Sequence, residues 1–177
     1  MPRDVLIRPT AEADLPTIQA IYAGAVGAGT GSFELRAPDL PEITRRWRKR
    51  VDKGYPHIVA TGGGAVLGYA YASRHRTSTA YRYLIEDSIF VASDAQGAGV
   101  GRALLTDLIA RCEETGFRQM IALIADANAS SVGLHARLGF ERVGVIEGSA
   151  FKHGRWIDTL LMQRALGEGS DSSPRDG

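Results

Sequence analysis

The sequence predicts an α/β domain in which helices flank a mixed central sheet. Segments with helical spacing of apolar residues alternate with short strand-like segments, in the order β-α-α-β-β-β-α-β-α-β-β. A polar loop with three glycines, at positions 97, 99 and 101, joins one predicted strand to an amphipathic helix. Ligands of open α/β sheets bind at such strand-to-helix edges. The length of 177 residues fits one domain.

The first half of the chain is expected to supply two helices and four strands. Asp14 and Asp39 are the expected helix caps, Asp39 with Glu42 in an acidic form of the capping box. Glycines at 24, 27, 29 and 31 predict a loose segment over 26–33. The expected elements are a strand over 5–8 ended by Pro9, helices over 14–25 and 40–53, a hairpin of strands 57–61 and 66–72, and a strand over 83–91.

The second half begins with the most strongly amphipathic helix, over 100–115, which Gly116 is expected to end. The continuous apolar run 120–125 is typical of a strand covered on both faces. Asn128 or Ser130 caps a short helix ended by Gly139. Strands over 140–146 and 157–163 follow, joined through residues 152–156. Residues 1–166 are expected to form the domain, and the Gly- and Ser-rich residues 167–177 a disordered tail.

Composition argues against several classes of protein. With 21 basic and 20 acidic residues interspersed, the chain has no basic surface that would indicate nucleic-acid binding. It has neither the start of a signal peptide nor an apolar run long enough to span a membrane. The single Cys112 fits a reducing cytoplasm, and its place on an apolar helix face predicts packing rather than an acyl-cysteine. The histidines lack metal-ligand spacing, so no metal is expected.

The loop over residues 96–102 is expected to bind an anion. Glycine lets the backbone approach a ligand closely, and the following helix start offers unpaired N–H groups and a partial positive charge. A nucleotide P-loop would need Gly-Lys-Ser or Gly-Lys-Thr, which does not occur in the sequence. A dinucleotide fingerprint beginning at Gly97 would need glycine where Arg102 stands. Both alternatives therefore fail on their residues.

The segment Gln96–Gly101 resembles the Q/R-x-x-G-x-G/A motif of the GCN5-related N-acetyltransferases (GNAT). Four further segments are similar to the phosphinothricin and methionine sulfone/sulfoximine acetyltransferases within that superfamily: Thr30–Glu34, Ala80–Arg82, Ile85–Val91 and Lys152–Asp158. The resemblance covers about residues 5–166. It implies a GNAT fold and a cytoplasmic, homodimeric enzyme of the herbicide- and antibiotic-resistance type. This enzyme would acetylate the α-amine of a small amino-acid-like substrate from acetyl-CoA by direct attack.

The resemblance also implies which residues bind the coenzyme. The strand before the loop is expected to splay from its neighbour, pair with the pantetheine arm and stabilise the oxyanion near Val91, while the loop holds the pyrophosphate. Arg102 fits a solvated helix residue equally well, and Asn128 can serve as a helix cap at the same time. The implied set is Ile89, Phe90, Val91, Gln96, Gly97, Ala98, Gly99, Val100, Gly101, Arg102, Asn128 and Arg137.

Glu86 is the expected general base. An ammonium has no lone pair, so a nearby carboxylate must take its proton before attack. Glu86 and Asp87 are adjacent; the resemblance favours Glu86, and Asp87 fits a solvated acid. His135 is expected either as a catalytic partner, which protonates the leaving thiolate or joins a relay, or as a packed helix residue.

The acceptor is expected to meet an arginine-rich loop and an aromatic–acidic pair. A guanidinium matches a carboxylate or phosphinate through two parallel hydrogen bonds, and Glu34 could orient the substrate ammonium; the other interpretation is a mobile charged loop. Lys152, Arg155 and Trp156 would close the site or form a dimer contact. The substrate-binding set is Phe33, Glu34, Arg74, Arg76, Thr79, Ala80, Tyr81 and Arg82.

Two alternatives stay open. The enzyme could acetylate another amine, namely a polyamine, an aminoglycoside or a protein N-terminus, although the arginines would repel cationic acceptors. The chain could also be a non-catalytic acyl-CoA sensor, against which Glu86 and the acceptor-side motifs argue. The physiological acceptor and the group that protonates the thiolate are not fixed by the sequence.

Overall fold

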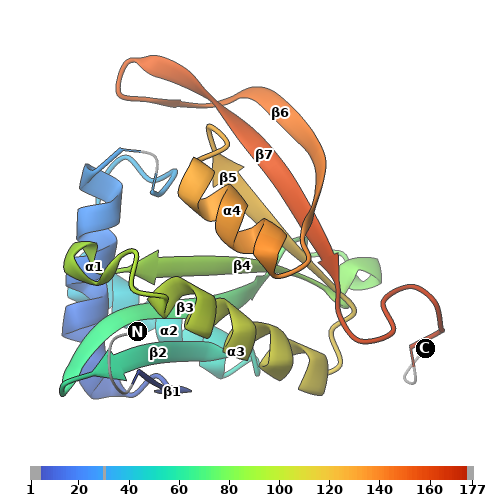
Figure 1. The fold of residues 1–177 in the computed structure, drawn as a ribbon, viewed down its shortest axis with the longest axis horizontal. Coiled ribbons are helices and arrows are strands. Elements are labelled where there is room, and N and C mark those ends of the chain that lie inside the picture. The colour runs from blue at the N-terminus through green and yellow to red at the C-terminus, as the bar shows by residue number, and fades with distance from the viewer. Residues whose placement is uncertain (1–4, 30, 175–177) are drawn as a thin grey trace.

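A seven-stranded mixed sheet, in the order β1-β2-β3-β4-β5-β7-β6, organises the computed structural model, which describes residues 5–29 and 31–174 (Figure 1). Helices α1 and α2 pack on one face, and α3 packs with α4 on the other. The predicted α/β class and element order are confirmed. The strands are β1 (Leu6–Pro9), β2 (His57–Gly62), β3 (Ala65–Arg74), β4 (Leu84–Val91), β5 (Gln119–Ala125), β6 (Glu141–Lys152) and β7 (Arg155–Ala165). The helices are α1 (Leu15–Gly27), α2 (Leu40–Val51), α3 (Val100–Glu114) and α4 (Ala129–Arg137), with short 3₁₀ turns η1 (Glu12–Asp14), η2 (Thr79–Tyr81) and η3 (Ser93–Ala95).

Helix α3 and strand β5 form the centre of the larger core, as their patterns predict. The apolar positions of α3 recur at helical spacing, and each is at most 6% exposed; they are Val100, Leu104, Leu105, Leu108, Ile109 and Cys112. On β5, Met120 and Ile121 point to opposite faces and both are buried. Burial raises the pKa of the Cys112 thiol to about 12, which keeps it protonated and inert.

Several predicted boundaries and one cap are wrong. Helix α1 continues through Gly24 to Gly27, because Val26 is buried in the core against the sheet and outweighs the poor helix propensity of glycine. Asp14 does not cap α1. Its carboxylate instead accepts hydrogen bonds from the Ala11 N–H at 2.8 Å and from both terminal nitrogens of Arg8. Asp39 does cap α2, accepting from the Glu42 N–H at 3.0 Å.

Strands β4 and β5 pair over only three residues before they separate. The parallel pairs are Leu84 with Gln119, Ile85 with Met120, and Glu86 with Ile121. Beyond Glu86, residues 87–91 pair only with β3, and residues 122–125 of β5 pair only with β7. The two strands diverge in Figure 1. The predicted splay is therefore confirmed, and from residue 87 onward no strand of the described residues lies beside one edge of β4.

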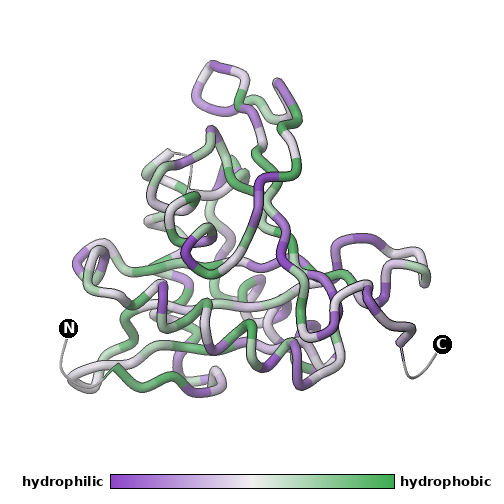
Figure 2. The backbone as a smooth tube through the Cα atoms, turned by 45° about the vertical axis from the view of Figure 1, so that its right-hand side comes forward, coloured by the Kyte–Doolittle hydropathy of each residue, from purple (hydrophilic) through white to green (hydrophobic). Residues whose placement is uncertain are grey.

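Strands β6 and β7 are longer than predicted and form a hairpin that projects from the sheet (Figure 2). Residues 152–156, predicted as a connection, hold its turn, with His153 and Gly154 at positive φ. At the tip, Lys152 is 3% exposed, and its Nζ donates to the carbonyl oxygens of Val26 (3.1 Å) and Ser32 (2.7 Å). One buried ammonium thus fixes the hairpin to the end of α1 and to the following loop.

The described end of the chain, residues 167–174, forms turns beside β5. Arg118 donates to the Gly169 carbonyl at 2.8 Å and to the Ser172 hydroxyl at 2.7 Å. The expected domain boundary at 166 and the disordered tail stay predictions; residues 175–177 lie outside the described residues. No helix in the described ranges is long and apolar enough to span a membrane.

Candidate functional site

The glycine loop opens onto free space where α3 begins. Gly97 and Gly99 have positive φ angles of 75° and 87°, and a Cβ at either position would meet nothing within 4 Å. The glycines are therefore required by backbone conformation rather than by crowding. Gly99 is the residue before α3, and no side chain of the described residues caps the helix there. The N–H groups of the first turn can thus bind an anion.

The open edge of β4 leads from this loop toward the middle of the sheet. Ile89 and Val91 pack toward α3, whereas the ring of Phe90 lies 4.9 Å from that of Tyr22 on α1. Gln96 closes the loop onto the strand by donating from Nε2 to the Val91 carbonyl at 3.3 Å. Backbone groups on an unpaired strand edge can hydrogen-bond an extended ligand. Strand and loop thus form one continuous surface for a long ligand with an anionic end.

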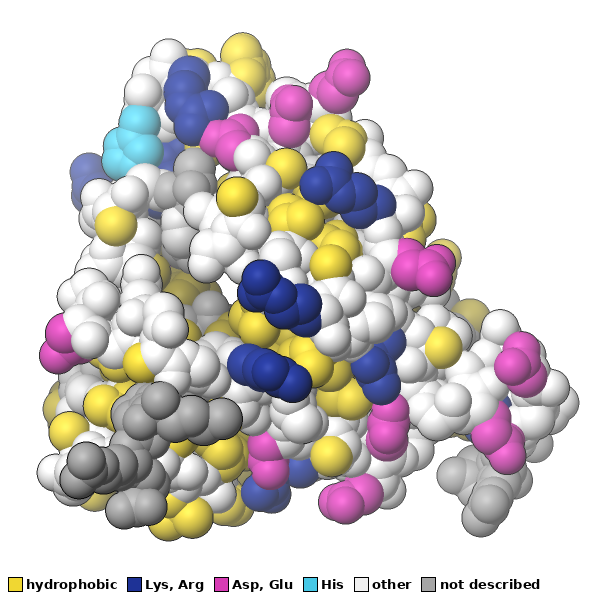
Figure 3. Space-filling model, viewed as in Figure 1, with side chains coloured by type: hydrophobic (Ala, Val, Ile, Leu, Met, Phe, Trp, Pro, Cys, Tyr) yellow, Lys and Arg dark blue, Asp and Glu magenta, His cyan; other side chains and the backbone are white. Residues whose placement is uncertain are grey.

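The more distant coenzyme candidates lie on the α3–α4 side. Asn128, rather than Ser130, caps α4 by accepting from the Ser131 N–H at 3.1 Å. Asn128, Arg102 and Arg137 are all exposed. On this face, Figure 3 shows Lys and Arg side chains around hydrophobic ones and a hollow beside α4. The predicted coenzyme roles of these three residues stay predictions.

Glu86 lies where β4 and β5 cease to pair. Its side chain is 26% exposed, and its Oε2 is 3.3 Å from Nδ1 of His75. Burial raises the pKa of Glu86, and the hydrogen bond from His75 opposes part of that rise. A carboxylate with a raised pKa is a better proton acceptor than an ordinary one. The role of Glu86 as the general base stays a prediction, with which this raised pKa is compatible.

Asp87 is not the solvated acid that the sequence indicated: it is 7% exposed and bonded to His135. His135 Nε2 lies 3.0 Å from Asp87 Oδ2, and Nδ1 donates to the Ser131 carbonyl at 2.7 Å. Burial lowers the pKa of His135, but the hydrogen bond and charge of Asp87, with the Ser131 carbonyl, outweigh burial, so the net shift is upward. The pair joins β4 to α4.

The two predicted catalytic residues lie on opposite faces of the sheet. Successive side chains of a strand alternate, so Glu86 points toward the α1–α2 side and Asp87 toward α4. His135, which is 5% exposed, therefore contacts Asp87 and not Glu86. Its geometry is that of a packed residue with both ring nitrogens bonded.

The arginine-rich loop lies at the end of β4 opposite the glycine loop, because it precedes Leu84 whereas the glycine loop follows Val91. Thr79, Ala80 and Tyr81 form η2 there and are exposed. Arg74 donates to the Thr77 carbonyl, and the Arg76 and Arg82 guanidiniums lie over the rings of Tyr81 and Tyr83. Within the described residues, none of these three arginines forms an ion pair, so all can accept an anionic ligand.

Phe33 and Glu34 form a separate group near the hairpin tip. Glu34 pairs with Arg46 of α2, and its N–H donates to the Ser32 hydroxyl, which also bonds Tyr22. No hydrogen bond, ion pair or ring contact in the described ranges joins this group to the arginine loop. The length of β4 separates them, since Tyr22 meets Phe90 near one end of the strand and the arginines lie beyond the other. Thr30 of the same motif lies outside the described residues.

The sequence did not indicate two contacts of the candidate catalytic residues. These are the contact of Glu86 with His75 and the contact of His135 with Asp87. The antiparallel register of β3 and β4 places Ser73 opposite Glu86, so His75 lies close to the same carboxylate. Pairing the two predicted strands through the intervening loop would have indicated this contact. The Asp87–His135 pair carried no local signal, because 48 residues separate its members.

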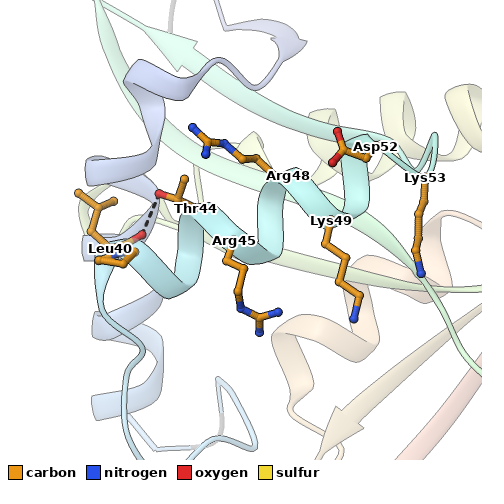
Figure 4. A pocket seen from close by; sticks show the side chains of 8 residues that line it. Leu40, Thr44, Arg45, Arg48, Lys49, Asp52 and Lys53 are labelled. Atoms are coloured by element: carbon orange, nitrogen blue, oxygen red, sulfur yellow. Dashed lines mark hydrogen bonds between the residues drawn. The ribbon is translucent and has the colours of Figure 1, made fainter.

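Two further depressions are lined by none of the predicted site residues. A shallow depression runs along the outer face of α2 and is lined by Arg45, Arg48, Lys49 and their helix neighbours (Figure 4). A smaller one lies between α1, α2 and the sheet, against Tyr69 and Tyr71. Among the described residues, no group of three or more His, Cys, Asp or Glu side chains could hold a metal ion.

Known proteins resemble the chain over most of its length. The model of the acetyltransferase (GNAT) family matches residues 25–140. A phosphinothricin N-acetyltransferase from Alcaligenes faecalis is 50% identical over 169 residues, covering 95% of this chain and 86% of that protein. An L-methionine sulfoximine/L-methionine sulfone acetyltransferase from Pseudomonas paraeruginosa is 41% identical over 161 residues, covering 90% and 94%.

A solved structure shares the fold closely. The phosphinothricin acetyltransferase from Sinorhizobium meliloti, in complex with AcCoA, superposes with a TM-score of 0.95 at 47% identity. The match covers 98% of this chain and 94% of that one.

Replacing Asp87 with Asn keeps the side-chain shape but removes the charge that favours protonated His135. Because the pKa of His135 is raised by folding, the pair stabilises the fold fully below the unfolded value of about 6.5, and this contribution is lost as the pH rises through the folded value. We expect Asp87→Asn to lower the free energy of unfolding by about 1–3 kcal/mol at about pH 6 and by less at about pH 9. Denaturant titrations at both pH values measure this. An equal loss at both would contradict the charged pair.

Proposed function

This chain belongs to the acetyltransferase (GNAT) family, and we propose that it transfers the acetyl group of acetyl-CoA to the α-amino group of a small amino-acid-like substrate. The observation that carries the proposal is the opening between β4 and β5, with the glycine loop at one end and Glu86 at the other. The two relatives above act, by their names, on phosphinothricin and on methionine sulfoximine or sulfone.

The residues of the opening fit the coenzyme. The uncapped N–H groups around Gly97–Arg102 would hold the pyrophosphate, and the free edge of Ile89–Val91 would pair with the amides of the pantetheine arm. Val91 and Glu86 are five residues apart, about 17 Å along an extended strand. A long extended arm therefore suits the distance between anion site and base. Bound acetyl-CoA supplies an activated acetyl thioester.

Glu86 would take a proton from the substrate ammonium, and the neutral amine then has the lone pair that attack requires. Backbone N–H groups on the unpaired edge of β4 are the candidate donors to the developing oxyanion. As the carbon–sulfur bond breaks, the departing thiolate takes up a proton from a donor group and leaves as coenzyme A thiol. His135 stays a prediction for that role, and its two hydrogen bonds and its burial support a bracing role instead.

The arginine loop is the proposed anchor for the acidic group of the acceptor. Its three guanidiniums lack carboxylate partners in the described ranges, and η2 holds Thr79, Ala80 and Tyr81 beside them. Such a cluster favours a carboxylate or phosphinate and disfavours polyamines and aminoglycosides. We place the enzyme in the cytoplasm, which the free and buried Cys112 suits.

Turnover with a panel of acceptors tests the proposal. Thiol release from acetyl-CoA should rise on addition of phosphinothricin, methionine sulfone or methionine sulfoximine, and should stay near background with spermidine and kanamycin. Acetyl-CoA binding without turnover on any amine would instead indicate a non-catalytic sensor. Turnover confined to peptides with a free N-terminus would contradict the small-substrate assignment.

Glu86→Gln removes the proposed base while keeping the shape of the side chain. We expect kcat/KM to fall by about 10²- to 10⁴-fold. In the wild type, kcat/KM should fall at low pH with a midpoint above the usual carboxyl range, because burial raises the pKa of Glu86. The variant should lack this acid limb. Glu114→Gln, at an exposed position, is the matched control and should keep both rate and profile. An unchanged acid limb in Glu86→Gln would overturn the assignment.

Gly99→Val tests the anion cradle, and Gly64→Val provides a control for backbone strain. Both glycines have positive φ, 87° and 82°, with free space around a Cβ, so both variants should lose similar stability. Only Gly99→Val should weaken acetyl-CoA binding, by at least about tenfold if the loop supplies the hydrogen bonds to the pyrophosphate. Calorimetric titration of both variants with acetyl-CoA measures the two affinities. Equal affinities would leave the cradle without support.

We also propose that the protein is a homodimer. Strand β6 lies at the sheet edge, and Val143, Val145 and Ile146 on it are each more than half exposed. A long apolar edge strand is an association surface unless another element covers it. Sedimentation velocity should find a dimer for the wild type and a monomer for Val145→Glu. A monomeric wild type would contradict the proposal.

A further inference from the structure

His75 lies beside the proposed base although it follows the end of β3. Arg74 is the last residue of β3 paired with β4, and the His75 ring reaches from there to Glu86. Nδ1 lies 3.3 Å from Oε2, and the two side chains are 21% and 26% exposed. We propose that His75 is a positioning residue for Glu86: its ring N–H holds Oε2, and Oε1 is then free to face the acceptor amine. This inference rests on the proposed function of Glu86.

A carboxylate that acts as a base in a half-buried site has two conflicting needs. It must be held in one orientation, and it must stay basic enough to take a proton. An arginine partner would hold it firmly but would lower its pKa strongly. An imidazole N–H holds one oxygen without a permanent charge. Within the described residues, no Arg or Lys forms an ion pair with Glu86, and His75 makes its side-chain hydrogen bond.

The other groups around the pair support this division of roles. Ser73 and Ile121, the neighbours of Glu86 on β3 and β5, carry no charge. Asp87 raises the pKa of Glu86 from the opposite face of the strand. Arg74 and Arg76 flank His75, but their recorded contacts are with the Thr77 carbonyl and the Tyr81 ring. His75 is therefore the group that opposes the rise that burial causes in the pKa of Glu86.

Two substitutions separate positioning from simple packing. His75→Ala removes the ring, whereas His75→Asn keeps an N–H donor close to the place of Nδ1. We expect His75→Ala to lower kcat/KM about tenfold and to move the acid limb to higher pH, because the hydrogen bond that lowers the pKa of Glu86 is lost. His75→Asn should recover most of the rate and most of the shift.

A double-mutant cycle shows whether His75 acts through Glu86. In the Glu86→Gln background, His75→Ala should cause no further loss of kcat/KM, because the carboxylate that it positions is gone. A further tenfold loss there would show an independent role. An unmoved acid limb in His75→Ala would likewise overturn the inference.

A readout without substrates keeps this inference distinct from the proposed function. Carbon-detected NMR of the glutamate carboxyl groups gives the pKa of Glu86, assigned through Glu86→Gln. We expect that pKa to be higher in His75→Ala than in the wild type, and close to the wild-type value in His75→Asn. If the wild type acetylates no acceptor, the proposed function fails. The NMR comparison still shows whether His75 lowers the pKa of Glu86 through their contact. An identical pKa of Glu86 in the wild type and in His75→Ala would overturn the inference that His75 positions Glu86.

Discussion

The early end of hydrogen bonding between β4 and β5 is the constraint on which the site depends. Only three residue pairs join the strands, and the last is Glu86 with Ile121. From there to Val91, one edge of β4 pairs with no other strand of the described residues, and η3 and the glycine loop follow. The buried residues of α3 and β5 hold the diverging strands on a rigid base. An unpaired edge inside a sheet is costly unless something satisfies it, and an extended ligand would do so.

Strand alternation assigns the polar residues at this opening to different tasks. Glu86 points toward the α1–α2 side and contacts His75, whereas Asp87 points toward α4 and contacts His135. Although Glu86 and Asp87 are adjacent, their side chains point to opposite faces. The carboxylate of Glu86 is half-buried and suited to proton transfer, whereas that of Asp87 is buried and holds helix α4 through His135. The same alternation explains why Glu86 has no contact with His135, the other catalytic candidate of the sequence analysis. Lys152 adds a third fixed point by closing the β6–β7 hairpin onto the end of α1.

The sequence predicted the features that neighbouring residues along the chain determine. Periodicity located the helix at Val100 and the doubly covered strand at 120–125, and the three glycines located the loop that precedes this helix. Features set by distant partners were missed. Val26 carries α1 past its glycines through tertiary packing, and Asp14 pairs with Arg8 instead of capping. The separation of Phe33 from the arginine loop also depends on the strand between them, which no local pattern records.

A structure of the protein with bound acetyl-CoA would test the central role of this opening most directly. We predict that the pyrophosphate lies against the N–H groups of Gly97–Arg102, that the pantetheine arm pairs with the free edge of β4, and that the thioester lies near Glu86. A coenzyme bound elsewhere, or one that leaves the unpaired edge of residues 87–91 without hydrogen bonds, would contradict this role.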